Sequence, residues 1–273
     1  MAAATGAALR ELRKRRSVIL AYHGVGDVDP RDDPDFLVIR PERFRRQVGL
    51  LLDAGFRFVT VAQFAQAAAG STPPPGLAAL SFDDGMEDNH SVLLPMLREW
   101  RIPATVYVVT GLIGMPNPWV HAEGARMMTA DELRELAASG IELGAHTASH
   151  PDLATLDHDG CLREMTESRR TLERLTGGPV RTFAYPFCSY APAAVAAARD
   201  AGFVAAVTCA GRGSWAPYEL KRVTVTSKDG MLSFVLKLAE MYQPLFDSPP
   251  GRALRVTTRG VRRRLRERRL SRA

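Results

Sequence analysis

The stretch Leu77-Ala78-Ala79-Leu80-Ser81-Phe82-Asp83-Asp84-Gly85 places two adjacent aspartates directly after a run of six mostly apolar residues. A short apolar run of this length is typical of a buried strand. The two acids would then begin the loop at the carboxyl end of that strand. An isolated Asp-Asp-Gly is also common in solvated turns, so the meaning of this pair depends on what surrounds it.

Runs of the same kind recur along the chain, and segments with helical spacing separate most of them. A helix that begins at Pro41 is one example, and a capping-box spacing from Thr129 to Glu132 predicts another. Such alternation predicts parallel strands with helices outside, as an open sheet or a closed barrel. Because the polar residues cluster after strands, we favour an α/β fold, a distorted (β/α) barrel of about seven strands in a single domain. The further strands are expected at 18–22, 56–61, 104–109, 141–145, 182–185, 203–208 and 222–226.

A second polar group follows another predicted strand, in His146-Thr147-Ala148-Ser149-His150. Two histidines four residues apart are also found on surfaces or in cores. Two imidazoles and one carboxylate together, however, form a ligand set suited to zinc or a similar divalent ion, with positions left open for water and substrate. One of the two aspartates could then bind the ion while the other accepts a proton from water.

These motifs resemble those of the polysaccharide deacetylase family, also called the NodB-homology or carbohydrate esterase family four group. Ser81-Phe82-Asp83-Asp84-Gly85 is similar to its first motif, Thr-Phe-Asp-Asp-Gly, and residues 142–150 are similar to its second. Phe183-Ala184-Tyr185-Pro186-Phe187 resembles the Phe-Ala-Tyr-Pro-Tyr form of its third. The likeness spans about residues 17–240 and implies a distorted (β/α) barrel.

The resemblance also implies residue roles. Asp83 is expected to be the general base, and a divalent metal, with zinc the favoured ion, is expected to be bound by three residues: Asp84, His146 and His150. The backbone around Phe187, in the segment Tyr185-Pro186-Phe187, is expected to bind substrate and the oxyanion.

The chain departs from the family pattern at two functional positions. The arginine that often begins the third motif and orients the base is absent, and so is the late Leu-x-His motif that supplies a general acid. No histidine follows His158. In a closed barrel the first and last strands are neighbours, so His23, after the first predicted strand, could act as the acid. The alternative is that His23 is a structural residue.

Aromatic and cysteine residues add weaker indications. Trp119 and Trp215 could stack on sugar rings at the rim of the site, although tryptophans in barrels also pack in the core. The three cysteines, Cys161, Cys188 and Cys209, are odd in number. We therefore expect no disulfide framework and a reducing compartment.

Charge is distributed unevenly. Residues 252–273 contain ten arginines and one acid, and the remainder has 26 basic and 29 acidic residues, a net charge of −3. This excludes a basic nucleic-acid-binding domain. We predict a basic extension (1–16), a catalytic domain (17–245) and an arginine-rich tail (246–273) that either is solvated or contacts an anionic membrane. With neither a secretory signal nor a long apolar run, we expect a cytoplasmic protein, with the tail as a candidate contact to the inner membrane face.

The function expected from these features is metal-dependent removal of an N-acetyl group from an acetamido sugar. The sugar would belong to an oligosaccharide, a polysaccharide or a lipid-linked precursor. Two alternatives stay open: a non-catalytic glycan-binding relative, and a deacylase of another amide or ester.

Overall fold

The computed structural model describes residues 2–69, 71–209 and 214–241. Residues 1–228 form one compact unit. Residues 229–273 belong to a second unit, whose described helix is α8 (Met231–Leu238). The arginine-rich tail predicted at 246–273 lies outside the described residues. Among the described helices, none combines the length and apolarity that a membrane span requires.

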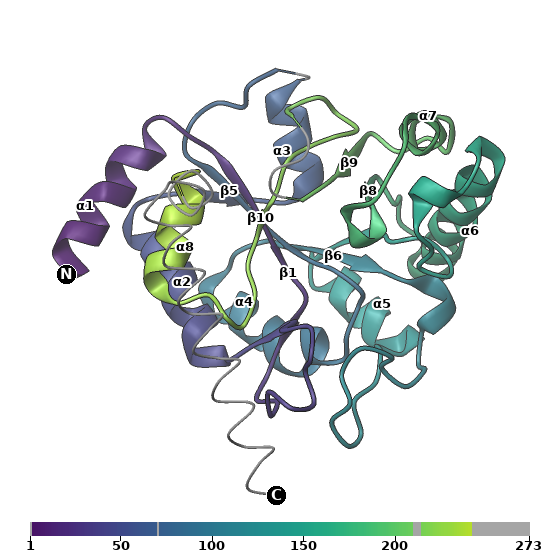
Figure 1. The fold of residues 1–273 in the computed structure, drawn as a ribbon, viewed down its shortest axis with the longest axis horizontal. Coiled ribbons are helices and arrows are strands. Elements are labelled where there is room, and N and C mark those ends of the chain that lie inside the picture. The colour runs from purple at the N-terminus through teal and green to yellow at the C-terminus, as the bar shows by residue number, and fades with distance from the viewer. Residues whose placement is uncertain (1, 70, 210–213, 242–273) are drawn as a thin grey trace, which may run out of the picture. The chain divides into compact units, whose positions relative to one another are not determined.

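A curled, all-parallel sheet forms the centre of the first unit (Figure 1). Its strands follow the order β10-β1-β5-β6-β7-β8-β9, and β4 pairs with the first half of β5. A parallel bridge from Val207 of β9 to Leu220 brings the far edge of the sheet to the segment that leads into β10. The predicted distorted (β/α) barrel is therefore confirmed. The strands are β1 (Val18–Tyr22), β4 (Arg57–Val59), β5 (Leu77–Phe82), β6 (Thr105–Val108), β7 (Glu142–Ala145), β8 (Thr182–Ala184), β9 (Ala205–Val207) and β10 (Val223–Thr224).

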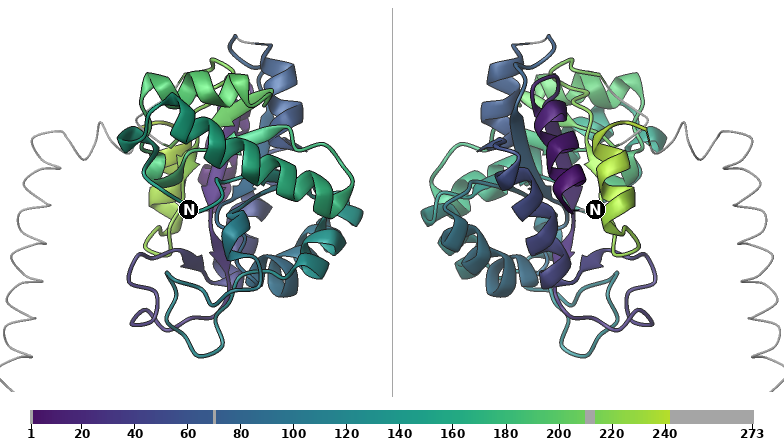
Figure 2. Two further views of the ribbon diagram at one scale, coloured as in Figure 1. Left: turned by 90° about the vertical axis from the view of Figure 1, so that its right-hand side faces the viewer. Right: turned by 90° about the vertical axis from the view of Figure 1, so that its left-hand side faces the viewer.

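Helices lie around the outside of this sheet, and α6 packs along α7 on one flank (Figures 1 and 2). Their ends follow local rules. Thr129 and Glu132 form the predicted capping box of α5, and Pro95 lies in the first turn of α4, after a π-helical turn. The helices of the first unit are α1 (Ala2–Arg13), α2 (Pro41–Asp53), α3 (Val61–Ala68), α4 (Leu94–Trp100), α5 (Ala130–Ala138), α6 (His158–Thr176) and α7 (Pro192–Asp200).

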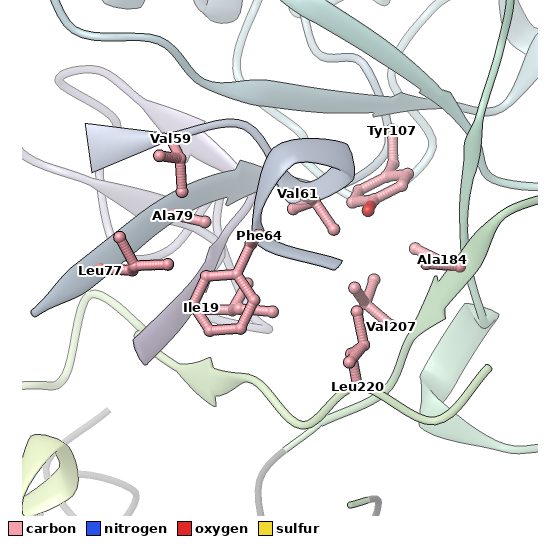
Figure 3. Packing of buried hydrophobic residues seen from close by; sticks show 11 residues of the cluster. Ile19, Val59, Val61, Phe64, Leu77, Ala79, Tyr107, Ala184, Val207 and Leu220 are labelled. Carbon is pink, nitrogen blue, oxygen red and sulfur yellow. The ribbon is translucent and has the colours of Figure 1, made fainter. Parts of the chain in front are cut away.

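Helix α3 closes the amino-terminal end of the barrel. Its Val61 and Phe64 pack against buried residues of β1, β5, β6, β8 and β9 (Figure 3). The first backbone N–H groups of α3 donate to side chains that begin neighbouring strands, Thr105 at 2.9 Å and Glu142 at 3.1 Å. Trp215 packs against the same cluster, which supports the core alternative given for it. With this end filled, the carboxyl end of the barrel is left for a site.

Two features were not anticipated from the sequence. A short parallel pair, β2 (Gly24–Val25) with β3 (Val38–Ile39), forms a second sheet directly after β1. Within the predicted basic extension, α1 contacts α2 and its Leu9 is buried. Two-residue strands and a helix with one buried leucine carry too little periodic apolar pattern to be recognised from sequence.

Candidate active site

The residues singled out from the sequence meet at the carboxyl ends of the strands. Asp83 and Asp84 follow β5, His146 follows β7 and Pro186 follows β8. His23 follows β1, which neighbours β5 in the sheet. Because the strands are parallel, these ends lie together at the end of the barrel opposite α3. The fold thus brings residues from four separate segments to one place.

Asp84, His146 and His150 form a compact set of potential metal ligands. Asp84 Oδ1 is 3.5 Å from His146 Nε2 and 3.6 Å from His150 Nε2. Such separations suit donors that each stand about 2 Å from one shared ion. His146 Nδ1 donates to the carbonyl oxygen of Ala184 at 2.7 Å, which leaves Nε2 as the electron-pair donor. The three residues therefore fit a divalent cation.

The protonation states of these groups agree with that fit. Burial lowers the pKa of His146 to about 4 and that of His150 to about 3, so both rings are neutral near pH 7. Burial raises the pKa of Asp84 well above its ordinary value, and the neighbouring Asp83 adds to the rise. A cation beside Asp84 would favour its ionised form instead.

The loops that hold these ligands have unusual backbone conformations. Asp84 and His150 have φ values of 76° and 59°, in the left-handed region that residues other than glycine rarely adopt. Glu164 of α6 anchors the histidine loop, because its carboxylate accepts the backbone N–H groups of Ala148 and Ser149, both at 2.9 Å. Strained residues persist where surrounding contacts impose them, and they are frequent at functional sites.

Asp83 is held by Arg222, a residue whose role sequence analysis missed. Arg222 precedes β10 and is fully buried. Its Nη1 and Nη2 donate to the two carboxylate oxygens of Asp83 at 2.6 and 2.8 Å, and its Nε donates to the carbonyl oxygen of Thr208 at 2.8 Å. This two-point contact fixes the plane of the carboxylate. The arginine absent from the third motif therefore has a substitute in a distant segment.

Arg222 also sets the charge of Asp83. Burial alone would raise the pKa of this carboxyl, but the charge of Arg222, with a contribution from its hydrogen bonds, holds the pKa well below its ordinary value. Asp83 is therefore ionised near neutral pH. The structure thus gives the two adjacent aspartates different surroundings, one facing the histidines and the other facing a guanidinium.

His23 lies beside this pair. Burial lowers the pKa of His23, and the nearby carboxylate of Asp83 opposes that shift. Among the described residues no partner bonds its buried Nδ1, while Asn89 Nδ2 donates to its backbone carbonyl at 2.9 Å. A buried ring nitrogen without a hydrogen-bond partner is uncommon in folded proteins and is a mark of residues with a chemical role. The structure brings His23 into the site, and its role as an acid stays a prediction.

The third motif forms one wall of the site. The hydroxyl of buried Tyr185 donates to the carbonyl oxygen of Tyr218 at 3.0 Å, so its side chain braces the loop. Phe187 is 64% exposed, and its ring centroid lies 4.5 Å from that of His150. Trp119 lies 4.9 Å from the same ring. Two aromatic rings therefore flank one of the metal-ligand candidates.

The expectation about cysteines is wrong for one pair. Cys188 and Cys209 form a disulfide with a Cα–Cα distance of 5.6 Å, whereas Cys161 is free and buried. The pair joins the loops after β8 and β9, neighbouring strands whose contact could not be read from an odd cysteine count. Cysteine usage therefore no longer supports a reducing compartment. The cytoplasmic location stays a prediction.

Comparison with known proteins adds independent findings. Residues 70–206 match the model of the family described as polysaccharide deacetylase. The chain is 30% identical to the chitin deacetylase of Colletotrichum lindemuthianum over 115 residues, which cover 42% of this chain and 43% of that protein. It is 29% identical to the poly-beta-1,6-N-acetyl-D-glucosamine N-deacetylase of Escherichia coli (strain K12) over 138 residues, 48% of this chain and 20% of that protein. The matches thus span less than half the length of either relative.

A solved structure gives the same result for the fold. The Streptococcus pyogenes deacetylase PplD, in complex with acetate, superposes with a TM-score of 0.70 at 24% sequence identity. The superposition covers 83% of this chain and 98% of that one. The distorted barrel is therefore shared over nearly the whole of that structure.

Proposed function

Because the chain belongs to the polysaccharide deacetylase family, we propose that it is a metal-dependent hydrolase that removes the N-acetyl group from an acetamido sugar. One observation carries this proposal: a three-donor set suited to a cation stands beside a carboxylate that a buried guanidinium anchors. The three-donor set suits a cation that would activate the amide carbonyl for attack, and the anchored carboxylate suits a positioned base.

Hydrolysis adds water across the amide bond, so that the acetyl carbon gains an oxygen, the nitrogen leaves as a free amine and acetate is released. A divalent cation on Asp84, His146 and His150, with zinc best matched to these donors, would supply Lewis-acid chemistry. Asp83 accepts the proton of the attacking water, because each of its oxygens keeps a lone pair beyond the one that Arg222 uses. Arg222 keeps this carboxylate ionised and fixed in orientation.

His23 is proposed to give the proton that the departing nitrogen needs. It lies near Asp83, and its Nδ1 is not bonded to any described group. The backbone N–H after Pro186 is proposed to stabilise the negative charge that develops on the acetyl oxygen. The aromatic rings of Trp119 and Phe187 offer apolar surface to the sugar beside His150.

The proposal is tested by acetate release from chitin oligomers and from β-1,6-linked N-acetylglucosamine oligomers, the substrate classes named in the two relatives. The enzyme is first stripped with a chelator, then assayed with and without added zinc. We expect one acetate per deacetylated residue, loss of activity on stripping and recovery with the ion. An O-acetylated sugar lacking N-acetyl groups is the matched control substrate.

Other results would favour the alternatives. Binding of the oligomers without acetate release by the zinc-loaded protein would identify a glycan-binding relative. Hydrolysis of the O-acetyl control alone would identify an esterase. Full activity after exhaustive stripping would contradict the metal dependence.

We also propose that the tail contacts anionic lipid at the inner membrane face. Its ten arginines, which lie outside the described residues, support this, since each cation near such a surface contributes about 1 kcal/mol. Sedimentation with phosphatidylserine-containing and neutral liposomes, using the full chain and a form ending at Gly251, tests it. We expect salt-sensitive binding that needs both the anionic lipid and the tail. Equal sedimentation of both forms would exclude the contact.

A further inference from the structure

The disulfide Cys188–Cys209 lies beside the segment proposed to bind the oxyanion. Cys188 directly follows Phe187, and Cys209 follows the end of β9 by two residues. The Cα–Cα distance of 5.6 Å is typical of a native disulfide. Both cysteines are partly exposed, unlike buried Cys161. A small thiol reagent therefore has access to this bond and not to the third cysteine.

The segment 186–190 after β8, called here the oxyanion loop, has a backbone conformation that requires a restraint. Phe187 and Cys188 are consecutive residues with φ values of 54° and 55°. Two neighbouring left-handed residues without glycine are unfavourable and persist only when the surroundings impose them. Burial does not impose this conformation, because the Phe187 side chain is 64% exposed. Two local hydrogen bonds, from the N–H of Cys188 to the carbonyl of Tyr185 at 3.2 Å and from the N–H of Ser189 to the carbonyl of Pro186 at 3.0 Å, each span only one turn.

The other end of the bond is firmly placed. Thr208, next to Cys209, is fully buried, and its N–H donates to the carbonyl of Leu220 at 2.9 Å. The Thr208 carbonyl accepts the Nε–H of Arg222, the residue that holds Asp83. The disulfide therefore connects the exposed loop after β8 to the same buried segment that supports the base.

We propose that the Cys188–Cys209 disulfide is a positioning element that holds the oxyanion loop in its active conformation, so that deacetylation depends on the redox state of this pair. The inference rests on the proposed function. Reduction by a dithiol breaks the S–S bond, transfers two electrons and two protons to form two thiols, and oxidises the dithiol to its cyclic disulfide. The freed loop can then leave the left-handed conformation, and its N–H no longer stays aligned with the acetyl oxygen.

The experiment compares the full chain before and after dithiothreitol treatment, with the reductant removed anaerobically and zinc restored before assay. Free thiols are counted by alkylation and mass spectrometry, which should find one before reduction and three after it under denaturing conditions. We expect kcat to fall about tenfold, a fraction of the loss from deleting an oxyanion donor, with KM within twofold and zinc content unchanged. Hydrogen exchange across residues 186–190 should accelerate.

Cysteine variants separate the effect of losing the disulfide from other effects of the reductant. Cys209→Ser should show the low kcat without reductant and no further response to it, and Cys188→Ser should match it. Cys161→Ala, the matched control, should keep the wild-type response. An unlinked Cys188 in the untreated chain, or an unchanged kcat after the thiol count reaches three, would overturn the inference. Absence of deacetylation in the untreated, zinc-loaded chain would instead refute the proposed function. The thiol count and the hydrogen exchange of residues 186–190 would still show whether the disulfide forms and whether it restrains the loop.

Discussion

The two halves of the site are built differently. The proposed metal half takes its three donors from two short segments: Asp84 lies two residues after β5, and His146 and His150 lie in one five-residue loop. The proposed proton-transfer half joins Asp83 to Arg222, 139 residues away in sequence, and adds His23, which follows the first strand. A metal site needs a particular donor set at close spacing, so its sequence is constrained locally. A carboxylate needs only a guanidinium in the right place, and several strands of a barrel can supply one.

Removing a metal ligand should have the largest effect. His146→Ala leaves two donors, so we expect loss of the ion and a fall in kcat/KM of at least about 10⁴-fold, since both base activation and charge stabilisation are lost together. Metal content by mass spectrometry and acetate release measure the two effects. His158→Ala is the matched control, because His158 is an exposed histidine that pairs with Asp200. Full activity of metal-free His146→Ala protein would remove the metal half from the mechanism.

Changing the base should cost activity but not the ion. Asp83→Asn keeps the size of the side chain and cannot accept the proton of water, so we expect near-normal zinc content and a rate lower by about 10³-fold. Loss of zinc from this variant, with a normal rate once the ion is restored, would show that the two aspartates have exchanged roles.

Replacing the arginine should have an intermediate effect. Arg222→Lys keeps the charge but not the two-point contact with Asp83, so we expect a fall in kcat of about 10²-fold with KM and zinc content little changed. The same substitution in an Asp83→Asn background should add almost nothing, because the two residues act as one unit. Equal losses in both backgrounds would mean that Arg222 supports the fold and not the base.

The comparison also shows how far the sequence can be interpreted. The barrel was predictable because its strands are apolar runs separated by amphipathic helices, and the ligand candidates were found because Asp83-Asp84 and His146 to His150 are compact motifs. The matched family region, 70–206, includes these motifs but excludes His23 and Arg222. The family match thus covers every proposed metal ligand but only Asp83 of the proposed proton-transfer half.

Arg222 was missed for a physical reason. Its importance comes from the register of β10 on β1, which pairs Val223 with Leu20, and from the path of its side chain to Asp83 across the barrel interior. Neither is encoded in local periodicity. One signal was present: Arg222 is the first residue of the strand predicted at 222–226, where burial would demand a partner for its charge. The pairing of Cys188 with Cys209 was missed because it also depends on which strands are neighbours.

Loss of the proposed acid should have a milder effect on turnover than loss of the base or of Arg222. His23→Ala should lower kcat about tenfold, at the low end for acid catalysis because solvent can deliver the proton. Burial lowers the pKa of His23, and an acid must be protonated to act, so native kcat/KM should fall as pH rises through a value below about 6.5. This alkaline limb should vanish in the variant. An unchanged pH profile would return His23 to a structural role.

The smallest effect should concern Asp88, a half-buried acid linked through Asn89 to the His23 backbone, which affects stability and not turnover. Asp88 accepts a hydrogen bond from Asn89 Nδ2 at 2.8 Å, and the same Nδ2 group donates to the His23 carbonyl at 2.9 Å. Burial raises the pKa of Asp88 from 3.8 to about 7. The folded state therefore retains a proton that the unfolded state releases between those values, and this contribution to stability is lost as pH rises through that window.

Asp88→Asn removes this titration. Relative to the native chain, the variant should gain at least about 1 kcal/mol in free energy of unfolding between pH 5 and pH 8, because one pKa unit corresponds to about 1.4 kcal/mol. Urea unfolding of both proteins at the two pH values measures the difference, and kcat at pH 7 should stay within about twofold, since Asp88 is outside the proposed acid–base pair. A native chain that gains stability on the variant as pH rises would show that the folded protein favours the Asp88 carboxylate. The proposed proton-transfer half would then contain a second anchored anion, Asp88, linked through Asn89 to the His23 backbone. It would differ from the proposed metal half by two fixed carboxylates and not one.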